Sequence, residues 1–155
     1  MPSQTPFDVP PPFHPLVPRD ALMYHITYHS SPGIILNHRL LLPLYLFGMF
    51  LTASPNNIAF SSVVSFVGGY GIASMRSIGL VFMLTVLGPL AAAAYFFNQW
   101  IIDFGGHLVY TYSTGGLTML GALLLQVLGH KRNEVIEAAD PRHGLLAAPV
   151  LEFTR

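Results

Sequence analysis

Three histidines at the borders between polar and apolar segments are the side chains in this chain best suited to chemistry. His29 and His38 lie near the start of the first long apolar stretch, and His130 follows the last one, directly after Gly129. Neutral imidazole is the commonest metal ligand in proteins and suits iron, zinc and copper. The sequence therefore predicts a metal site built from His29, His38 and His130.

A carboxylate and two more histidines could extend this site. Glu134 stands one helical turn after His130, where it could complete or orient the ligand set. His25 precedes His29 by four residues, which puts both rings on one helix face, although neighbouring tyrosines repeat this spacing and fit an interfacial face instead. His107 follows a carboxylate by four residues, but glycines between them weaken a helix there. Each histidine also has a structural interpretation, as a side chain that satisfies a helix end.

Charged residues are confined to short borders between long apolar stretches. Asp, Glu, Lys and Arg are absent from residues 40–75, 77–102 and 104–130, and only 9% of the chain is charged. An ionised side chain at the bilayer centre costs roughly 2.5–3.5 kcal/mol even on insertion scales, so a membrane selects such gaps. A soluble core would be interrupted by surface charges every turn or two. The pattern predicts a polytopic membrane protein.

Net charge and cysteine content exclude several functions. The formal net charge is zero, and no basic cluster exceeds the pair Lys131 and Arg132, so a nucleic-acid partner is not expected. Cysteine is absent, which excludes disulfides, thiolate metal sites and cysteine nucleophiles. A metal site in this chain therefore cannot use thiolate ligands.

The elements that position the histidines are predicted to form an all-α membrane helix bundle of about four transmembrane helices, with five as the alternative. Residues 1–18 are expected to be a proline-rich disordered leader, and residues 19–155 a single membrane-embedded helical domain. A short helix over residues 20–29 should end at residues 30–33, where proline and glycine disfavour its continuation. The predicted spans are residues 39–54, 58–75, 77–97 and 117–128. The last one crosses a membrane only if it joins part of the ambiguous stretch 98–116.

The number of crossings decides which histidines share a membrane face. With four crossings, the start of the first helix and the end of the last lie on one side, which brings His38, the nearby His29 and His130 together. His107, between the third and fourth segments, would lie deeper or on the far side. Five crossings would instead separate His38 from His130.

Two motifs in this order resemble those of a known enzyme family. The motifs are Tyr28-His29-x-x-Pro32-x5-His38-x4-Pro43 before the spans and Gln126-x-x-Gly129-His130-x3-Glu134 after them. Their spacing and position are similar to those of the membrane-bound 2-hydroxy fatty acid dioxygenases, the yeast-type enzymes of fatty-acid α-oxidation in phytosphingosine breakdown. The resemblance covers roughly residues 20–155 and rests on finding both motifs in this architecture.

This resemblance implies an integral membrane protein of the endoplasmic reticulum that uses Fe(II) and dioxygen to shorten a 2-hydroxy fatty acid by one carbon. It places the family's histidines on His29, His38 and His130 and its acidic residue on Glu134. A further histidine of the yeast-type enzyme falls on His107.

A long-chain hydroxy acid would bind the metal through its carboxyl and 2-hydroxyl groups while its hydrocarbon chain lies among the helices. Tyr28 and Arg39 could assist by hydrogen bonding or by pairing with the carboxylate. Two alternatives stay open. A lipid or terpenoid isomerase or cyclase would use the histidines as acid–base groups, without metal or dioxygen. A non-catalytic membrane scaffold or lipid-binding protein would tolerate alanine at His29 or His130.

Overall fold

The structure is a computed structural model that describes the backbone of residues 31–75 and 77–133 and the side chains of residues 31–73 and 80–133. Every regular element in this part of the chain is helical, which confirms the all-α class. The elements are α2 (Pro32–Ala53), α3 (Asn57–Met75), α4 (Ser77–Phe82), the π-helical turn η1 (Met83–Leu87), α5 (Gly88–Asp103) and α6 (Leu108–Asn133). The predicted leader and the predicted helix over residues 20–29 lie outside the described residues.

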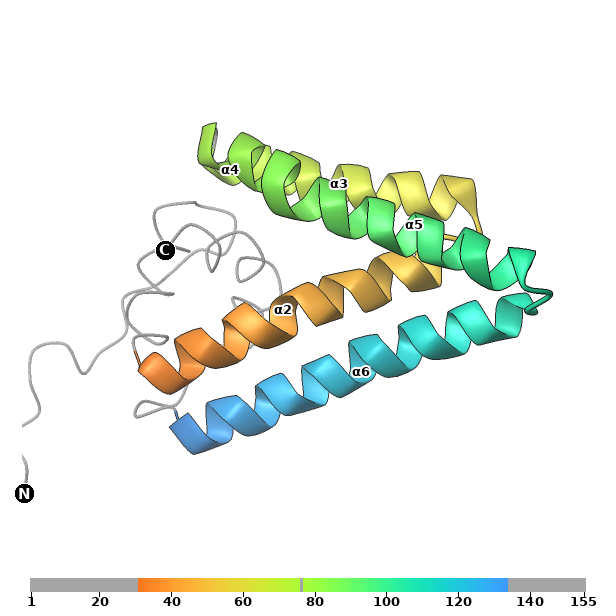
Figure 1. The fold of residues 1–155 in the computed structure, drawn as a ribbon. Coiled ribbons are helices and arrows are strands. Elements are labelled where there is room, and N and C mark those ends of the chain that lie inside the picture. The colour runs from red at the N-terminus through yellow and green to blue at the C-terminus, as the bar shows by residue number, and fades with distance from the viewer. Residues whose placement is uncertain (1–30, 76, 134–155) are drawn as a thin grey trace, which may run out of the picture.

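The helices form two antiparallel pairs (Figure 1). α2 lies beside α6, and α3 lies beside the continuous rod made by α4, η1 and α5. A contact between α2 and α5 joins the two pairs. Because successive rods run in opposite directions, the start of α2 and the end of α6 reach the same end of the bundle, here named the histidine end. The opposite end, which carries residues 54–56 and 104–107, is named the turn end.

Helix α2 begins earlier than the sequence indicated. The Ile34 amide donates a hydrogen bond of 3.2 Å to the Ser31 hydroxyl oxygen, which caps the helix. Pro32 occupies the first turn, where the missing N–H of proline leaves no helical hydrogen bond unmade. Pro32 and Gly33, where the predicted helix over residues 20–29 should end, thus form the start of α2, and the predicted first span over 39–54 starts too late. As a result, His38 lies inside α2, in its second turn.

The stretch 98–116 contains the turn between the last two helices. Gly105 has a φ of 73°, the left-handed conformation that commonly closes a helix. The Gly106 amide then donates to the Ile101 carbonyl oxygen at 2.8 Å. α6 begins shortly afterwards at Leu108, so the fourth predicted segment joins part of the ambiguous stretch. The described part of the chain therefore has four helical rods, not five.

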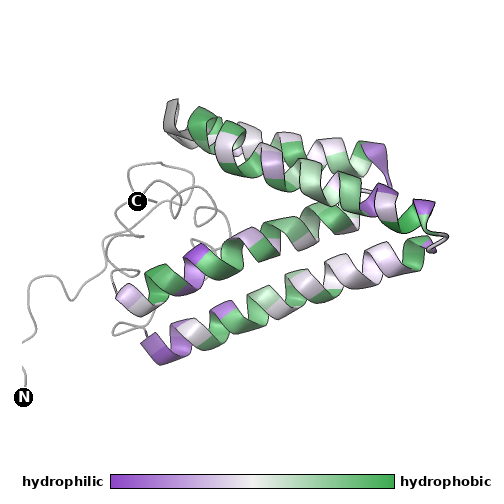
Figure 2. Cartoon of the chain, viewed as in Figure 1, coloured by the Kyte–Doolittle hydropathy of each residue, from purple (hydrophilic) through white to green (hydrophobic). Residues whose placement is uncertain are grey.

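Three stretches are long and apolar enough to cross a membrane, judged by length and composition: Pro32–Ala53, Leu80–Asp103 and Leu108–Asn133. α3 is apolar but shorter, over Asn57–Ala73. Large apolar side chains face outward, such as Leu117 at 72% and Leu124 at 63% exposure on α6. Water disfavours such a surface, whereas lipid tails match it. Figure 2 shows hydrophilic residues mainly near the helix ends, with apolar residues along the helices between.

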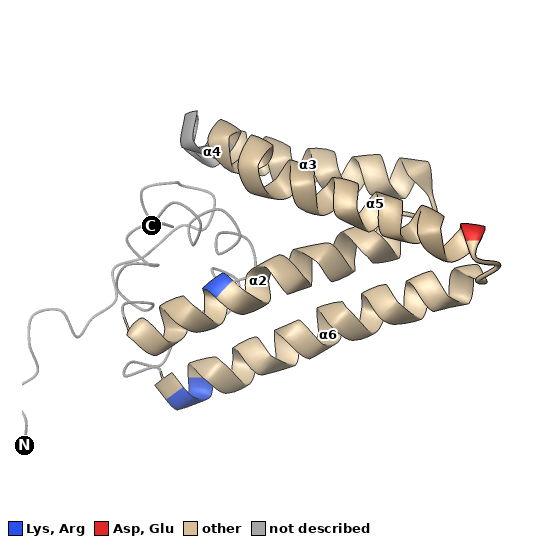
Figure 3. Cartoon of the chain, viewed as in Figure 1, with Lys and Arg blue, Asp and Glu red and all other residues tan. Residues whose placement is uncertain are grey.

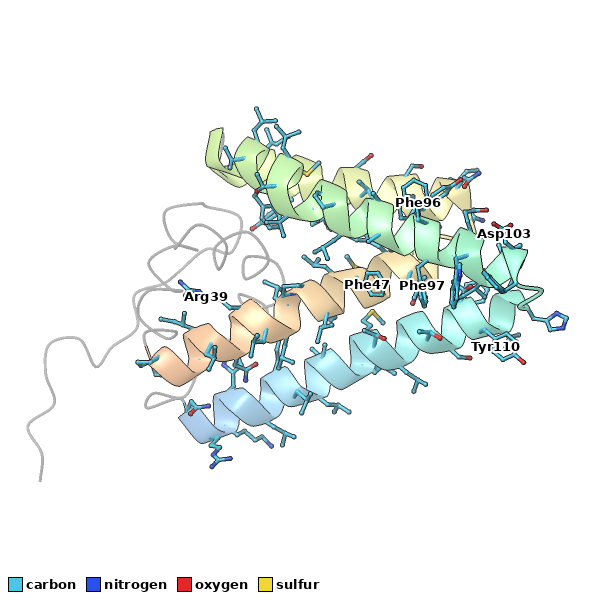
Figure 4. All side chains as sticks on the ribbon, viewed as in Figure 1. Arg39, Phe47, Phe96, Phe97, Asp103 and Tyr110 are labelled. Atoms are coloured by element: carbon cyan, nitrogen blue, oxygen red, sulfur yellow. The ribbon has the colours of Figure 1, made fainter. Side chains whose placement is uncertain are left out.

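The core that joins the two pairs lies between α2 and the rod made by α4, η1 and α5. Its buried members are Leu42, Leu46, Phe50, Leu51, Phe82, Leu87, Ala91 and Ala94. Phe47 of α2 meets Phe97 of α5 edge to face, with ring centroids 6.2 Å apart (Figure 4). Large side chains of α2 thus share this core with two alanines of α5.

Glycines allow α2 and α6 to approach closely near their middles. A Cβ atom at Gly48 would lie 2.6 Å from the Met119 amide nitrogen and 2.7 Å from the Gly115 carbonyl oxygen. A Cβ atom at Gly115 would lie 2.7 Å from the Thr52 nitrogen and 2.9 Å from the Gly48 carbonyl oxygen. These neighbours are backbone atoms, so they move only if the helices separate. Small residues at the contact let membrane helices pack in this way.

We expect Gly115→Ala to destabilise the bundle and Gly116→Ala to be neutral or slightly stabilising. The first methyl group would press on the α2 backbone, at a cost of about 1–3 kcal/mol, whereas nothing lies within 4 Å of a Cβ atom at Gly116. Alanine is also the better helix former. Thermal unfolding in detergent should give a lower midpoint for Gly115→Ala only. Equal midpoints for the two variants would contradict this packing.

Candidate metal site

His38 and His130 meet at the histidine end. Their Nε2 atoms lie 2.6 Å apart, and the ring centroids lie 4.8 Å apart with the ring planes at 71°. His38 is only 3% exposed, and His130 is partly buried. The structure thus brings together two of the three predicted metal ligands, in the arrangement expected of four crossings.

Helix α2 presents His38 to α6 from a buried stripe. Ile34, His38, Leu42 and Leu46 recur at intervals of four residues, and all four are buried. A polar ring in such an apolar stripe is unfavourable unless it makes a hydrogen bond. His130, in the last turn of α6, supplies that partner. The contact between α2 and α6 therefore explains how a histidine is accommodated in this stripe.

The two facing nitrogens can share a proton or hold a metal ion. A hydrogen bond between them requires one ring to donate from a protonated Nε2 and the other to accept at its Nε2 lone pair. A metal ion bound to both nitrogens at roughly 2.1 Å would hold them about 3.0–3.4 Å apart, so the two nitrogens would have to separate by about 0.4–0.8 Å. Imidazole nitrogens suit iron, zinc and copper. The donor set and its convergence fit such an ion.

Further ligands would have to come from beyond the described residues. Within residues 31–75 and 77–133, no three His, Asp or Glu side chains gather in a way that could hold a metal ion. The predicted ligands His29 and Glu134, the less favoured His25 and the predicted assisting residue Tyr28 all lie outside this part of the chain. Glu134 is the next residue after α6 ends at Asn133.

Two of the predicted site residues do not join the histidine pair. Arg39 follows His38 but is exposed, and it points away from α6 (Figure 4). His107 lies in the turn that precedes α6, at the turn end, which is about 34 Å from His130 along the helix axis at 1.5 Å per residue. This separation excludes His107 from any site that contains both His38 and His130.

Two asparagines beside the pair were not singled out from the sequence. Asn37 Nδ2 donates to the Leu125 carbonyl oxygen at 3.4 Å, and Asn133 Nδ2 donates to the Gly129 carbonyl oxygen at 2.9 Å. Both belong to the segments that carry the histidines. An amide side chain next to a histidine in an otherwise apolar helix was the available signal for Asn37.

A second buried polar contact lies toward the turn end. The Thr111 hydroxyl donates to Asn98 Oδ1 at 2.9 Å, and neither side chain is more than 1% exposed. The contact joins α6 to α5 and contains no titratable group. It therefore holds the two pairs of helices together.

Comparison of the chain with protein-family models, with curated proteins and with solved structures finds no match. The resemblance to the 2-hydroxy fatty acid dioxygenases consequently rests on the sequence of this chain, on its motifs and their place relative to the apolar segments. The function has to be argued from the histidine end itself.

We expect the effects of His38→Ala and His130→Ala on stability to be non-additive. Either substitution alone removes the contact between the two rings, so the double variant should lose less than the sum of the single losses, by about 0.5–3 kcal/mol. Unfolding of the wild type, both single variants and the double variant in detergent measures this coupling. His38→Ala combined with the distant His107→Ala is the control and should be additive. Additivity in both cycles would show that the rings do not interact.

Proposed function

We propose that this chain is a membrane-bound dioxygenase that uses Fe(II) and dioxygen to shorten a long-chain 2-hydroxy fatty acid by one carbon. The observation that carries the proposal is the meeting of His38 and His130, with Nε2 atoms 2.6 Å apart. They come from opposite ends of the described chain, and each belongs to one of the two motifs that resemble this family. A contact between both motifs is what a shared site requires.

The side chains at the histidine end would bind the metal ion and orient the substrate. His38 and His130 would hold the iron, with His29 and Glu134 as the remaining ligand candidates. Bound iron supplies the activation of dioxygen that organic side chains cannot provide. The apolar stripe around His38 keeps bulk water from one side of the pair. The burial of His38 also fixes its ring, so little rearrangement is needed when a ligand binds.

The proposed reaction balances without a further reductant. The bond between C1 and C2 of the hydroxy acid breaks, C1 leaves as carbon dioxide, and C2 becomes the carboxyl carbon of the shortened acid. The organic substrate gives up four electrons, and dioxygen accepts them to yield the new carboxyl oxygen and one water. A 2-hydroxy acid and dioxygen are therefore sufficient reactants.

The distribution of charge and apolar surface matches an amphiphilic substrate. Arg39, Lys131 and Arg132 lie toward the histidine end, where they favour a carboxylate (Figure 3). The helices beyond them are apolar over most of their length. A fatty acid could thus place its polar head near the histidine pair and its chain along the helices.

The second candidate is a lipid or terpenoid isomerase or cyclase. A hydrogen bond between two imidazoles already pairs a proton donor with an acceptor, as acid–base catalysis requires. This function differs from the first in needing neither metal nor dioxygen.

We expect detergent-purified protein to contain about one iron per chain and to lose it in both His38→Ala and His130→Ala. His107→Ala should retain the metal, since it lies at the turn end. Elemental analysis of protein before and after addition of Fe(II) measures this. Turnover of a 2-hydroxy fatty acid under oxygen should follow the metal content. Protein that neither contains nor takes up iron would exclude the dioxygenase and favour acid–base chemistry or a non-catalytic role.

We further propose that the histidine end faces the cytoplasm, with the protein in the endoplasmic reticulum. Loops next to membrane spans carry an excess of Lys and Arg on the cytoplasmic side. Arg39, Lys131 and Arg132 lie toward the histidine end, and Asp103 lies at the turn end (Figure 3). The turn end would then face the lumen.

Because the chain has no cysteine, single cysteines can report this orientation. We expect Lys131→Cys to react with a membrane-impermeant maleimide in sealed microsomes, whose outer face is cytoplasmic. Asn57→Cys, exposed at the turn end, should react only after permeabilisation. The reverse pattern would overturn the assigned orientation.

A further inference from the structure

The contact between Asn37 and Gly129 lies directly beside the histidine pair. Asn37 precedes His38 on α2, and Gly129 precedes His130 on α6. A Cβ atom at Gly129 would overlap the Asn37 amide group, so the amide occupies space that only glycine leaves open. The two contacts, Asn37 with Gly129 and His38 with His130, thus join the same two helical segments.

Asn37 is half-buried, and hydrogen bonds satisfy its amide group poorly. Its Nδ2 atom makes one long hydrogen bond of 3.4 Å to the Leu125 carbonyl oxygen. Its Oδ1 atom is buried and has no hydrogen-bond partner in the described part of the chain. A buried polar atom in that state costs about 1–3 kcal/mol. A leucine of similar size would avoid this cost, so stability alone does not account for asparagine here.

The alignment of α2 against α6, here called their register, provides a reason for an asparagine at this position. α2 and α6 approach most closely at Gly48 and Gly115, near their middles, and the apolar contacts between them carry no directional bonds. A buried polar residue is known to select one alignment of paired helices at a cost in stability. In the structure the Asn37 amide lies over Gly129 and from there reaches the Leu125 carbonyl oxygen. A shift of one residue moves a helical side chain by 1.5 Å along the axis and about 100° around it.

We propose that Asn37 and Gly129 form a register lock that positions His38 against His130. The lock is a positioning device and not a ligand. One turn further along, Gly33 faces the Asn133 side chain, which bonds to the Gly129 carbonyl oxygen at 2.9 Å. This second asparagine–glycine contact supports the same alignment. In it the two helices exchange roles, because the glycine lies on α2 and the asparagine on α6.

The first test measures register directly and does not depend on the proposed function. Spin labels at Leu40→Cys and Leu128→Cys, both outward-facing, report the distance between α2 and α6 by pulsed electron resonance. Asn37→Leu and Gly129→Ala should each broaden or displace the distance distribution. Gly121→Ala, where nothing lies within 4 Å of an added Cβ atom, should leave it unchanged. An unchanged distribution in folded Asn37→Leu protein would overturn the register lock.

The second test links register to the site and rests on the proposed function. Asn37→Leu should weaken iron binding by about tenfold or more, as changes in residues that support metal ligands do, while thermal stability stays equal or rises. If Gly129→Ala protein fails to fold, adding Asn37→Ala should restore folding by making room for the methyl group. Wild type without iron affinity would refute the proposed function, and the spin-label distances would still decide the lock. Iron affinity unchanged in Asn37→Leu protein would refute the positioning role.

Discussion

The close contact between α2 and α6 is the constraint on which the candidate site depends. At their middles the two backbones approach so closely that Gly48 and Gly115 each face backbone atoms of the other helix. Further toward the histidine end the same two helices bring His38 and His130 together. A larger residue at either glycine would push the helices apart and separate the rings. The geometry of the candidate site therefore depends on backbone packing about three turns away along α2 and about four turns away along α6.

A lipid surrounding gives this packing its importance. In water, the burial of apolar side chains would drive helices together, but lipid tails are as apolar as leucine, so close van der Waals contact and polar bonds must hold the helices. The structure shows both kinds of interaction. Glycines give the close approach of α2 and α6, and the bond from Thr111 to Asn98 ties α6 to α5. Meanwhile large side chains such as Leu117 and Leu124 face outward.

Four polar side chains gather at the histidine end, where the proposed amphiphilic substrate would place its head group. Asn37, His38, His130 and Asn133 lie at the same end, beside the basic residues of α6. Beyond the histidine end, the helices are apolar, and a hydrocarbon chain could lie along them. A polar layer at one end of an apolar bundle favours molecules with a polar head and a long tail. That match supports a lipid substrate for either of the chemistries that the histidine pair allows.

The sequence by itself determined the class of the fold, and with four helices it predicted that His38 and His130 lie at the same end of the bundle. The long gaps without charged residues predicted the apolar helices. Parity then needed only the number of helices, which the sequence left at four or five and which the described residues show to be four rods. The sequence could not supply the cap at Ser31 that starts α2 early, since the same proline and glycine can end a helix or begin one.

Only the tertiary structure decided which faces meet. Helices surrounded by lipid are apolar on every side, so periodicity does not reveal whether a given face packs against protein or lipid. The pairing of α2 with α6, the fit of Asn37 over Gly129 and the 2.6 Å approach of the rings all depend on that choice of face. The exclusion of His107 depends on α6 being continuous over its full length, which the glycine-rich stretch 98–116 left ambiguous because glycines can either interrupt a helix or pack inside one.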